Sequence, residues 1–489
     1  MNEPRPSSPS PAATPAPTAC PVAAIDRSCR LPVLFLFVSG AAWLLAGSVL
    51  SLLASIHLHA PNFLSHRAAL GYGRLQPASQ EALLYGFCLP AAMGIGLWLF
   101  ARLGSTPLVQ PGLAIFGSAF WNLGCAFGIG GILAGDATGF AAFNLPGYAG
   151  GMLLAGYLLV SISAALTFHQ RKVTTLFPSL WFLVAALFWF PWIFTSAQLF
   201  LVVAPVRGMA QAVIAWWYAN NLQNVYLWLT GLAAVFYLLP KTTGNALYSR
   251  NLALLVFWLV LVFSSWGGIP ASAPVPAWIP TLSLVATLVS LVTVFAVLTA
   301  CRRTVRRPAA PVAPASLRFV RFGVASFVVA GLMQVVAAFP CVSAITDFTW
   351  YGAARTQINV FGFFAMVAFG AIYFIVPRVA GFECLCPKRT KAHFWLAAVG
   401  LVLTVVPEAV AGLNEGLKLG DANLSFLQIS ADSFHLMRVS TLGILSVVLG
   451  QAFFLVNLLT YVIGTSRKWV LAEASAATTD RLKTAGVNS

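Results

Sequence analysis

Few residues of this chain could bind a metal or a heme. It has six histidines, and imidazole is a side chain that both iron and copper favour in proteins. His57 and His59 end one apolar run, and His435 lies near the start of another. Because residues two apart do not share a face of a helix, His57 and His59 would not chelate one ion together. We interpret these three as interfacial histidines and keep them as alternative ligands, together with Met93, Met209, Met366 and Met437.

Other reactive arrangements are missing from the sequence. No C-x-x-C-H motif for covalent heme attachment occurs, and no Ser/His/Asp or Cys/His pattern indicates a hydrolase. We therefore assign no catalytic residue and no metal site.

A group of amide side chains lies inside one apolar run, at Asn220, Asn221, Gln223 and Asn224. Polar groups at membrane depth are costly and usually face the interior of a helix bundle. They either form hydrogen bonds between helices or line a polar cavity. The candidate polar core consists of Asn220, Asn221, Asn224, Arg355, Gln357 and Asn359. A buried Arg355 would need a partner, and Asp347 is the nearest acidic residue in sequence.

The composition indicates a membrane protein. Of 489 residues, 59% are hydrophobic and only 8% are charged, whereas about 25% are charged in soluble domains. The net charge of +16 could suggest nucleic-acid binding, but the charges lie mainly in short loops between apolar runs. We therefore expect the lipid bilayer, and not a nucleic acid, as the partner.

Apolar runs long enough to span a bilayer predict twelve helices. Their ranges are 32–58, 81–103, 111–134, 145–169, 178–203, 212–240, 251–270, 276–300, 319–341, 354–379, 393–413 and 432–464. We expect a disordered Pro/Ala/Ser-rich tail over 1–30, a membrane domain over 31–466 and a C-terminal tail over 467–489. The proline-containing loop 302–321 is expected to act as a hinge.

The loop charges predict the orientation of the chain. Most basic residues fall in the tails and in alternate loops, including Arg302, Arg303 and Arg306. The positive-inside rule therefore places both termini in the cytoplasm. Acidic residues favour the other face, where we expect solvated loop ends; they are Glu81, Asp136, Asp347, Glu408, Glu415, Asp421 and Asp432.

Five segments resemble the subunit I family of heme-copper oxidases, in particular the C-family (cbb-type) cytochrome c oxidases. Y-G-R-L-Q-P at 72–77 is similar to F-G-R-L-R-P, and W-W-Y-A-N-N at 216–221 is similar to W-W-Y-G-H-N. Y-L-L-P-K at 237–241 resembles Y-F-V-P-K, and G-A-I-Y-F-I-V-P-R at 370–378 resembles G-S-L-Y-H-L-I-P-K. A-H-F-W-L-A at 392–397 matches the start of the eleventh helix. The resemblance implies an all-α integral membrane bundle of twelve transmembrane helices, in a bacterial inner membrane.

The resemblance also implies six histidine ligands for two hemes and one copper, and none of these positions holds a histidine here. The former heme-ligand positions are Ser79, Arg355 and Gln357. The former copper-ligand positions are Asn220, Pro270 and Ala271, and Ser264 replaces the cross-linked tyrosine. Ser and Asn are poor heme ligands, and Pro and Ala offer no side-chain donor. We therefore expect no cofactor and no oxygen reduction by the family mechanism.

These substitutions lead to a functional hypothesis with two alternatives. We expect a ligand-depleted, non-catalytic homologue that acts as a subunit or partner of a respiratory electron-transfer complex, beside other membrane subunits. One alternative is a heme-binding oxidase or reductase subunit with rearranged ligands. The other is a transporter or channel that uses the polar core.

Overall fold

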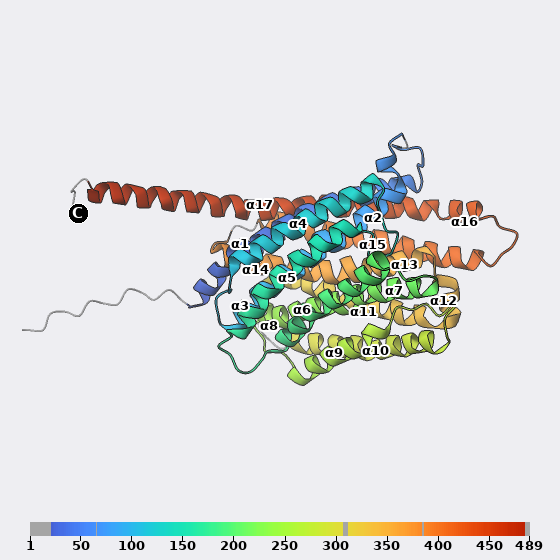
Figure 1. Cartoon of the computed structure of the whole chain (residues 1–489), viewed down its shortest axis with the longest axis horizontal. Helices are drawn as coiled ribbons and strands as arrows, with labels where there is room; N and C mark the ends of the chain where they lie inside the picture. Colours follow the sequence, from blue (N-terminus) through green and yellow to red (C-terminus); the bar gives the residue numbers. More distant parts are fainter. Residues whose placement is uncertain (1–20, 65, 307–311, 384–385, 485–489) are drawn as a thin grey trace, which may run out of the picture.

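The computed structural model describes residues 21–64, 66–306, 312–383 and 386–484, and they form a bundle of long helices (Figure 1). Eleven of its spans are long and apolar enough to cross a membrane. They are α1 (Pro21–His57), α2–η2–α3 (Tyr72–Gly104), α4 (Pro111–Ala134), α5 (Gly147–His169), α6–η3 (Pro178–Val203), α7–η4–α8 (Met209–Thr243), α10 (Trp278–Val305), α11 (Pro314–Ala338), α13–η6–α14 (Trp350–Ala380), α15 (Pro387–Lys418) and α17 (Phe434–Thr484).

The predicted seventh helix, 251–270, is shorter than expected. It consists of α9 (Arg250–Val262) and the single turn η5 (Ser264–Trp266). Gly267 and Gly268 follow, and Gly268 has a φ of +91°, which a right-handed helix does not accommodate. The expected all-α membrane fold is confirmed. The twelve predicted spans correspond to eleven long ones and this short one.

Three spans form the centre of the bundle. The most apolar windows of Tyr72–Gly104, Met209–Thr243 and Trp350–Ala380 are 94%, 89% and 94% buried, and the other windows are at most 56% buried. The outer helices keep apolar side chains on their exposed faces, as helices that contact lipid do. The central helices therefore position any internal site.

Each central span contains a wide π-helical segment, η2 (Ala82–Cys88), η4 (Asn221–Tyr226) and η6 (Ile358–Ala365). Such segments are rare and are frequent at functional sites. η4 and η6 begin directly after Asn220 and Gln357, and η2 begins three residues after Ser79. Three of the expected ligand positions, Ser79, Asn220 and Gln357, therefore lie just before the points where the helices widen.

All three central spans begin earlier than hydropathy predicts. The second span was expected at 81–103, but α2 (Tyr72–Glu81) adds a polar turn before it. That turn is fixed by Arg74, which donates a hydrogen bond of 3.0 Å to the carbonyl of Leu133 at the end of α4. Tertiary contacts therefore stabilise helical turns that composition alone does not reveal.

The predicted N-terminal tail needs a correction, because α1 begins at Pro21. Residues 21–30 are helical and held by polar contacts. Asp26 forms an ion pair of 3.0 Å with Arg102 and accepts a hydrogen bond of 2.9 Å from Trp98, while Arg30 donates to the carbonyl of Val379. Residues 1–20 of the expected tail lie outside the described residues.

The other predicted boundaries also change. The expected hinge 302–321 is largely helical, because α10 runs to Val305 and α11 starts at Pro314. Between them, the backbone N–H of Val312 donates a hydrogen bond of 2.8 Å to the carbonyl of Thr242, and 307–311 lie outside the described residues. The expected C-terminal tail from 467 continues α17 as far as Thr484.

The start of α1 and the C-terminal half of α17 lie at the same end of the bundle (Figure 1). The short helices α12 (Pro340–Thr346) and α16 (Phe426–Asp432) lie at the opposite end. The two ends of the described chain therefore lie at the same end of the bundle. Which side is cytoplasmic stays a prediction from loop charge.

Candidate functional site

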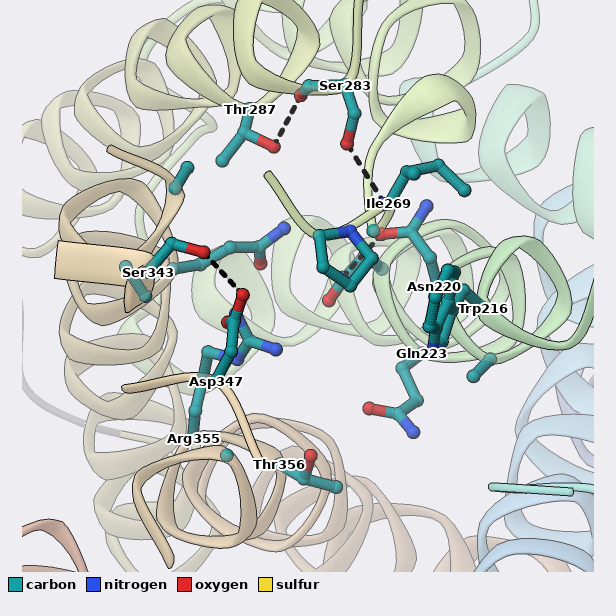
Figure 2. Close-up of a pocket in the computed structure, with 18 of the residues that line it drawn as sticks. Trp216, Asn220, Gln223, Ile269, Ser283, Thr287, Ser343, Asp347, Arg355 and Thr356 are labelled. Atoms are coloured by element: carbon teal, nitrogen blue, oxygen red, sulfur yellow. Dashed lines mark hydrogen bonds between the residues drawn. The ribbon is translucent and has the colours of Figure 1, made fainter. Parts of the chain in front are cut away.

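Two internal cavities lie beside the central spans. The first, here called the amide cavity, is drawn in Figure 2. It measures about 310 Å³ and is lined by Asn220, Asn224 and Asn359 among others. The second, called the serine cavity, measures about 360 Å³ and is lined by Ser48, Ser51 and Ser55 of α1 among others. Their common wall is formed by Ala141, Gln223, Gly352 and Thr356.

The amides of the first cavity form a continuous chain of hydrogen bonds. The indole of Trp228 donates to Asn359 Oδ1 over 2.8 Å, and Asn359 Nδ2 donates to Asn224 Oδ1 over 2.8 Å. Asn224 Nδ2 then donates to Asn220 Oδ1 over 2.9 Å, and Asn220 Nδ2 donates to the Ser264 carbonyl over 2.7 Å. This amide chain connects α8, η6, η4, α7 and η5, so each buried amide is satisfied by another element or by its own neighbour.

The loop after η5 packs tightly against Asn220. A Cβ atom built on Gly268 would meet Asn220 Cβ at 2.4 Å, and one built on Gly267 would meet Asn220 Oδ1 at 3.3 Å. The side chain at position 220 is therefore limited in size by the backbone beside it. Both functional atoms of Asn220 are already used in the amide chain.

Arg355 faces the same cavity from α13. Figure 2 shows Arg355 and Asp347 on one side of the cavity and Trp216, Asn220 and Gln223 on the other. No oxygen of Asp347 lies within 4.0 Å of an Arg355 nitrogen, the limit for an ion pair. Asp347 Oδ2 instead accepts hydrogen bonds from the hydroxyls of Ser343 and, over 3.4 Å, Ser272. The expected partner is therefore near Arg355 but is bound to hydroxyl groups.

The six residues of the candidate polar core do not all face the same cavity. Asn220, Asn224, Asn359 and Arg355 line the amide cavity. Asn221 points elsewhere: it accepts from the Trp189 indole over 3.2 Å and donates to the Ser265 carbonyl over 3.1 Å, which ties α6 to η5. Gln357 lines the serine cavity. One continuous polar core of all six residues is therefore not formed.

The expected ligand positions divide in the same way. Pro270 and Ala271 join Asn220 and Arg355 around the amide cavity. Ser79 joins Gln357 around the serine cavity, and its hydroxyl donates to the Gln76 carbonyl over 2.8 Å. Ser264 is buried beside the amide cavity, and its hydroxyl has no hydrogen-bond partner among the described residues.

The alternative histidine ligands lie outside both cavities. His57 is buried at the end of α1, in edge contact with Phe63. His59 is hydrogen-bonded through Nε2 to the Thr441 hydroxyl over 3.1 Å. His435 is exposed near the start of α17. The three do not line a common cavity.

Three of the acidic residues that were expected as solvated loop ends are buried, namely Glu81, Glu408 and Glu415. Glu81 is fully buried and accepts hydrogen bonds from the backbone and side-chain nitrogens of Asn144, over 2.8 and 2.9 Å. Glu408 lines the serine cavity and accepts from Ser440 over 3.0 Å. Neither is a solvated loop end. Both stay buried because polar groups on neighbouring segments donate hydrogen bonds to them.

Sequence reasoning also missed polar residues that face the cavities. Gln334 of α11 lines the amide cavity, and Tyr72 lines the serine cavity. A glutamine in the middle of an apolar run was a usable signal for Gln334. Tyr72 gave none, because it belongs to the polar turn that hydropathy excluded from the helix.

The donors of the amide cavity do not fit a copper centre of the expected kind. The side chains that line it are amides, hydroxyls, one carboxylate, one guanidinium and apolar groups. Copper favours imidazole and thiolate or thioether donors, and a guanidinium has no lone pair to offer. The serine cavity offers oxygen donors, including the Tyr72 phenol and the Glu408 carboxylate.

Comparison with known proteins decides the family. The family described as Cytochrome C and Quinol oxidase polypeptide I matches residues 32–463. The chain belongs to this family. The expected resemblance to the subunit I family of heme-copper oxidases is thereby confirmed.

Relatives within this oxidase family resemble the chain over most of their length. The Cbb3-type cytochrome c oxidase subunit CcoN1 of Stutzerimonas stutzeri is 23% identical over 81% of this chain and 85% of its own. Cytochrome c oxidase subunit 1 of Rhodobacter capsulatus is 24% identical over 85% and 82%. A solved heme-copper terminal oxidase dimer has the same fold, with a TM-score of 0.67 at 14% identity over 88% and 84%.

These matches correct one expectation. The sequence led us to expect no cofactor, but the relatives are cytochrome c oxidases and the structural match is a heme-copper oxidase. Hemes and copper therefore belong to the proteins that share this scaffold. The expectation failed because it equated the loss of six expected histidines with the loss of all binding, although other donors line the cavities.

Proposed function

We propose that this member of the oxidase family is a membrane subunit of a respiratory oxidase complex that does not reduce oxygen at its amide cavity. The observation that supports the proposal is the pair of hydrogen bonds that the Asn220 side chain forms. Asn220 stands where the resemblance places a copper ligand, and its two polar side-chain atoms hold Asn224 and the Ser264 carbonyl. A metal at this position would have to break the amide chain.

The scaffold around this position supports a role within a complex. The matched family region covers nearly the whole described bundle, and relatives with this scaffold are subunits of cytochrome c oxidases. Buried amides that are fully satisfied fix the packing of helices, which is what a structural subunit requires. Other membrane subunits are the expected partners.

The experiment isolates the full chain with its partners. We expect the tagged chain, extracted from its native membrane in mild detergent, to co-purify with other membrane subunits. If the complex consumes oxygen with ascorbate and a mediator as electron donors, Asn220→Leu should leave the rate per complex unchanged. A cyanide-sensitive rate that this substitution abolishes, with subunit content unchanged, would contradict the proposal.

A second candidate function is a heme-binding subunit with rearranged ligands, which the cofactors of the structural match favour. The serine cavity holds the phenol of Tyr72, and tyrosine is an axial heme ligand in some proteins. A reduced-minus-oxidised absorbance spectrum of the purified chain tests this candidate. A heme band that Tyr72→Phe shifts or removes supports it, and a heme band that is identical in the variant argues against Tyr72 as the ligand.

A further inference from the structure

Three side chains with free hydrogen-bond donors face the amide cavity. Arg355, Gln223 and Gln334 line it from α13, η4 and α11, and none forms a side-chain hydrogen bond with another described residue. The asparagines beside them each donate one hydrogen bond and accept one in the amide chain. Three long polar side chains with free donors therefore face one cavity.

We propose that the amide cavity binds a small oxyanion, a carboxylate or a phosphate, through Arg355 with help from Gln223 and Gln334. A guanidinium presents two parallel N–H donors that match the oxygens of such groups. Arginines inside membrane spans are costly and usually mark a substrate or ion pathway. The inference rests on this cavity and goes beyond the role proposed above.

The ligand would enter from the end of the bundle where α12 lies. A smaller cavity of about 160 Å³ adjoins the first and shares Arg355, Asp347 and Trp216 with it. Its lining includes Phe348, which is 83% exposed in the turn after α12. Because α12 lies at an end of the bundle (Figure 1), Phe348 is exposed at that end, and a water-soluble anion is the expected source.

The carboxylate of Asp347 should weaken the affinity of the site for an anion. This carboxylate lies beside the same cavity and would repel an anion, although the hydroxyls of Ser343 and Ser272 already satisfy one oxygen. Removing that negative charge should strengthen binding, since like charges in a partly buried site are weakly screened. Asp347→Asn and Arg355→Ala should thus change the affinity in opposite directions.

The test measures the thermal unfolding midpoint of the purified full chain in nanodiscs while sodium acetate or inorganic phosphate is titrated at constant ionic strength. A ligand that binds the folded state raises the midpoint in a saturable manner. We expect saturation in the wild type, an apparent affinity weakened by about tenfold or more in Arg355→Ala, and a tighter affinity in Asp347→Asn. Arg207→Ala, an exposed arginine in a loop, is the matched control and should behave as wild type.

Three results would overturn the proposal. The first is the absence of a saturable rise of the unfolding midpoint with either anion in the wild type. The second is an equal rise in the wild type and in Arg355→Ala. The third is loss of the rise in Arg207→Ala. If Arg355→Ala does not fold, Gln334→Leu replaces it and should weaken binding. Nanodiscs of phosphatidylcholine and of phosphatidylglycerol separate the two sources of the anion. A rise of the unfolding midpoint with acetate or phosphate in phosphatidylcholine nanodiscs supports a soluble ligand. A midpoint that rises only in phosphatidylglycerol nanodiscs, without a response to either anion, would contradict a soluble source.

Discussion

At the scale of single residues, the amide chain shows how the interior of this oxidase-family bundle is satisfied without the expected imidazoles. Each amide is both donor and acceptor, so Asn359 can accept from Trp228 and donate to Asn224 at the same time. A group that lost its partner would stay buried without water, which costs about 1–3 kcal/mol. The chain therefore behaves as a unit in which each member depends on its neighbours.

Replacement of Asn359 by Ala should lower the stability of the chain by about 1–3 kcal/mol, because Trp228 Nε1 loses its acceptor and Asn224 Oδ1 loses its donor. Unfolding in detergent, followed by circular dichroism, measures the change. A double-mutant cycle with Asn224→Ala should show coupling above about 0.5 kcal/mol. Asn251→Ala, at an exposed asparagine, is the control. Additive costs for the two amides would argue against a connected chain.

The sequence predicts that these amides are buried, but it does not predict their hydrogen-bond partners. Amides within an apolar run must find partners, so Asn220, Asn224 and Asn359 could be assigned to the interior from their positions alone. Which amide meets which depends on the rotation of each helix, and the π-helical segments η4 and η6 change that rotation. For this reason Asn221 and Gln357 were grouped with the others, although they face different surroundings.

At the scale of elements, the short seventh helix determines the shape of the amide cavity. α9 ends at Val262, and the chain then turns through Gly267 and Gly268 so that its backbone contacts Asn220. The length of this helix could not be predicted from hydropathy, because Ile269, Pro270 and Ala271 continue the apolar run after helical structure has ended. The backbone is already extended at Gly267, and the positive φ of Gly268 does not fit a right-handed helix.

Gly268→Ala should therefore be more harmful than the same change at Gly139. Both glycines have positive φ, +91° and +83°, so each substitution introduces backbone strain of about 1 kcal/mol or more. A new Cβ at Gly268 would also meet Asn220 at 2.4 Å, whereas nothing lies within 4 Å at Gly139. The difference between the two unfolding free energies measures the steric contact alone. Equal losses of stability would mean that the loop does not press on Asn220.

At the scale of the whole molecule, the loop charges and the helix count predict both termini on the cytoplasmic side. The structure places the start of α1 near the end of α14, where Arg30 donates to the Val379 carbonyl, and Cys386 follows that end. Cys341 lies in the first turn of α12, at the opposite end. Two natural cysteines outside the membrane spans thus mark the two faces of the protein.

Labelling these cysteines with a membrane-impermeant maleimide tests the orientation. In Cys20→Ser/Cys384→Ser, we expect Cys341 to react in intact spheroplasts and Cys386 to react only in inverted vesicles. Hydrogen bonds from the backbone and side chain of Arg389 hold the pKa of the Cys386 thiol below its ordinary value, so this cysteine should form its reactive thiolate at a lower pH than an ordinary thiol. Cys341→Ser and Cys386→Ser identify each product by mass spectrometry. Labelling of Cys386 in intact spheroplasts would reverse the predicted orientation and would place the mouth of the amide cavity on the cytoplasmic side.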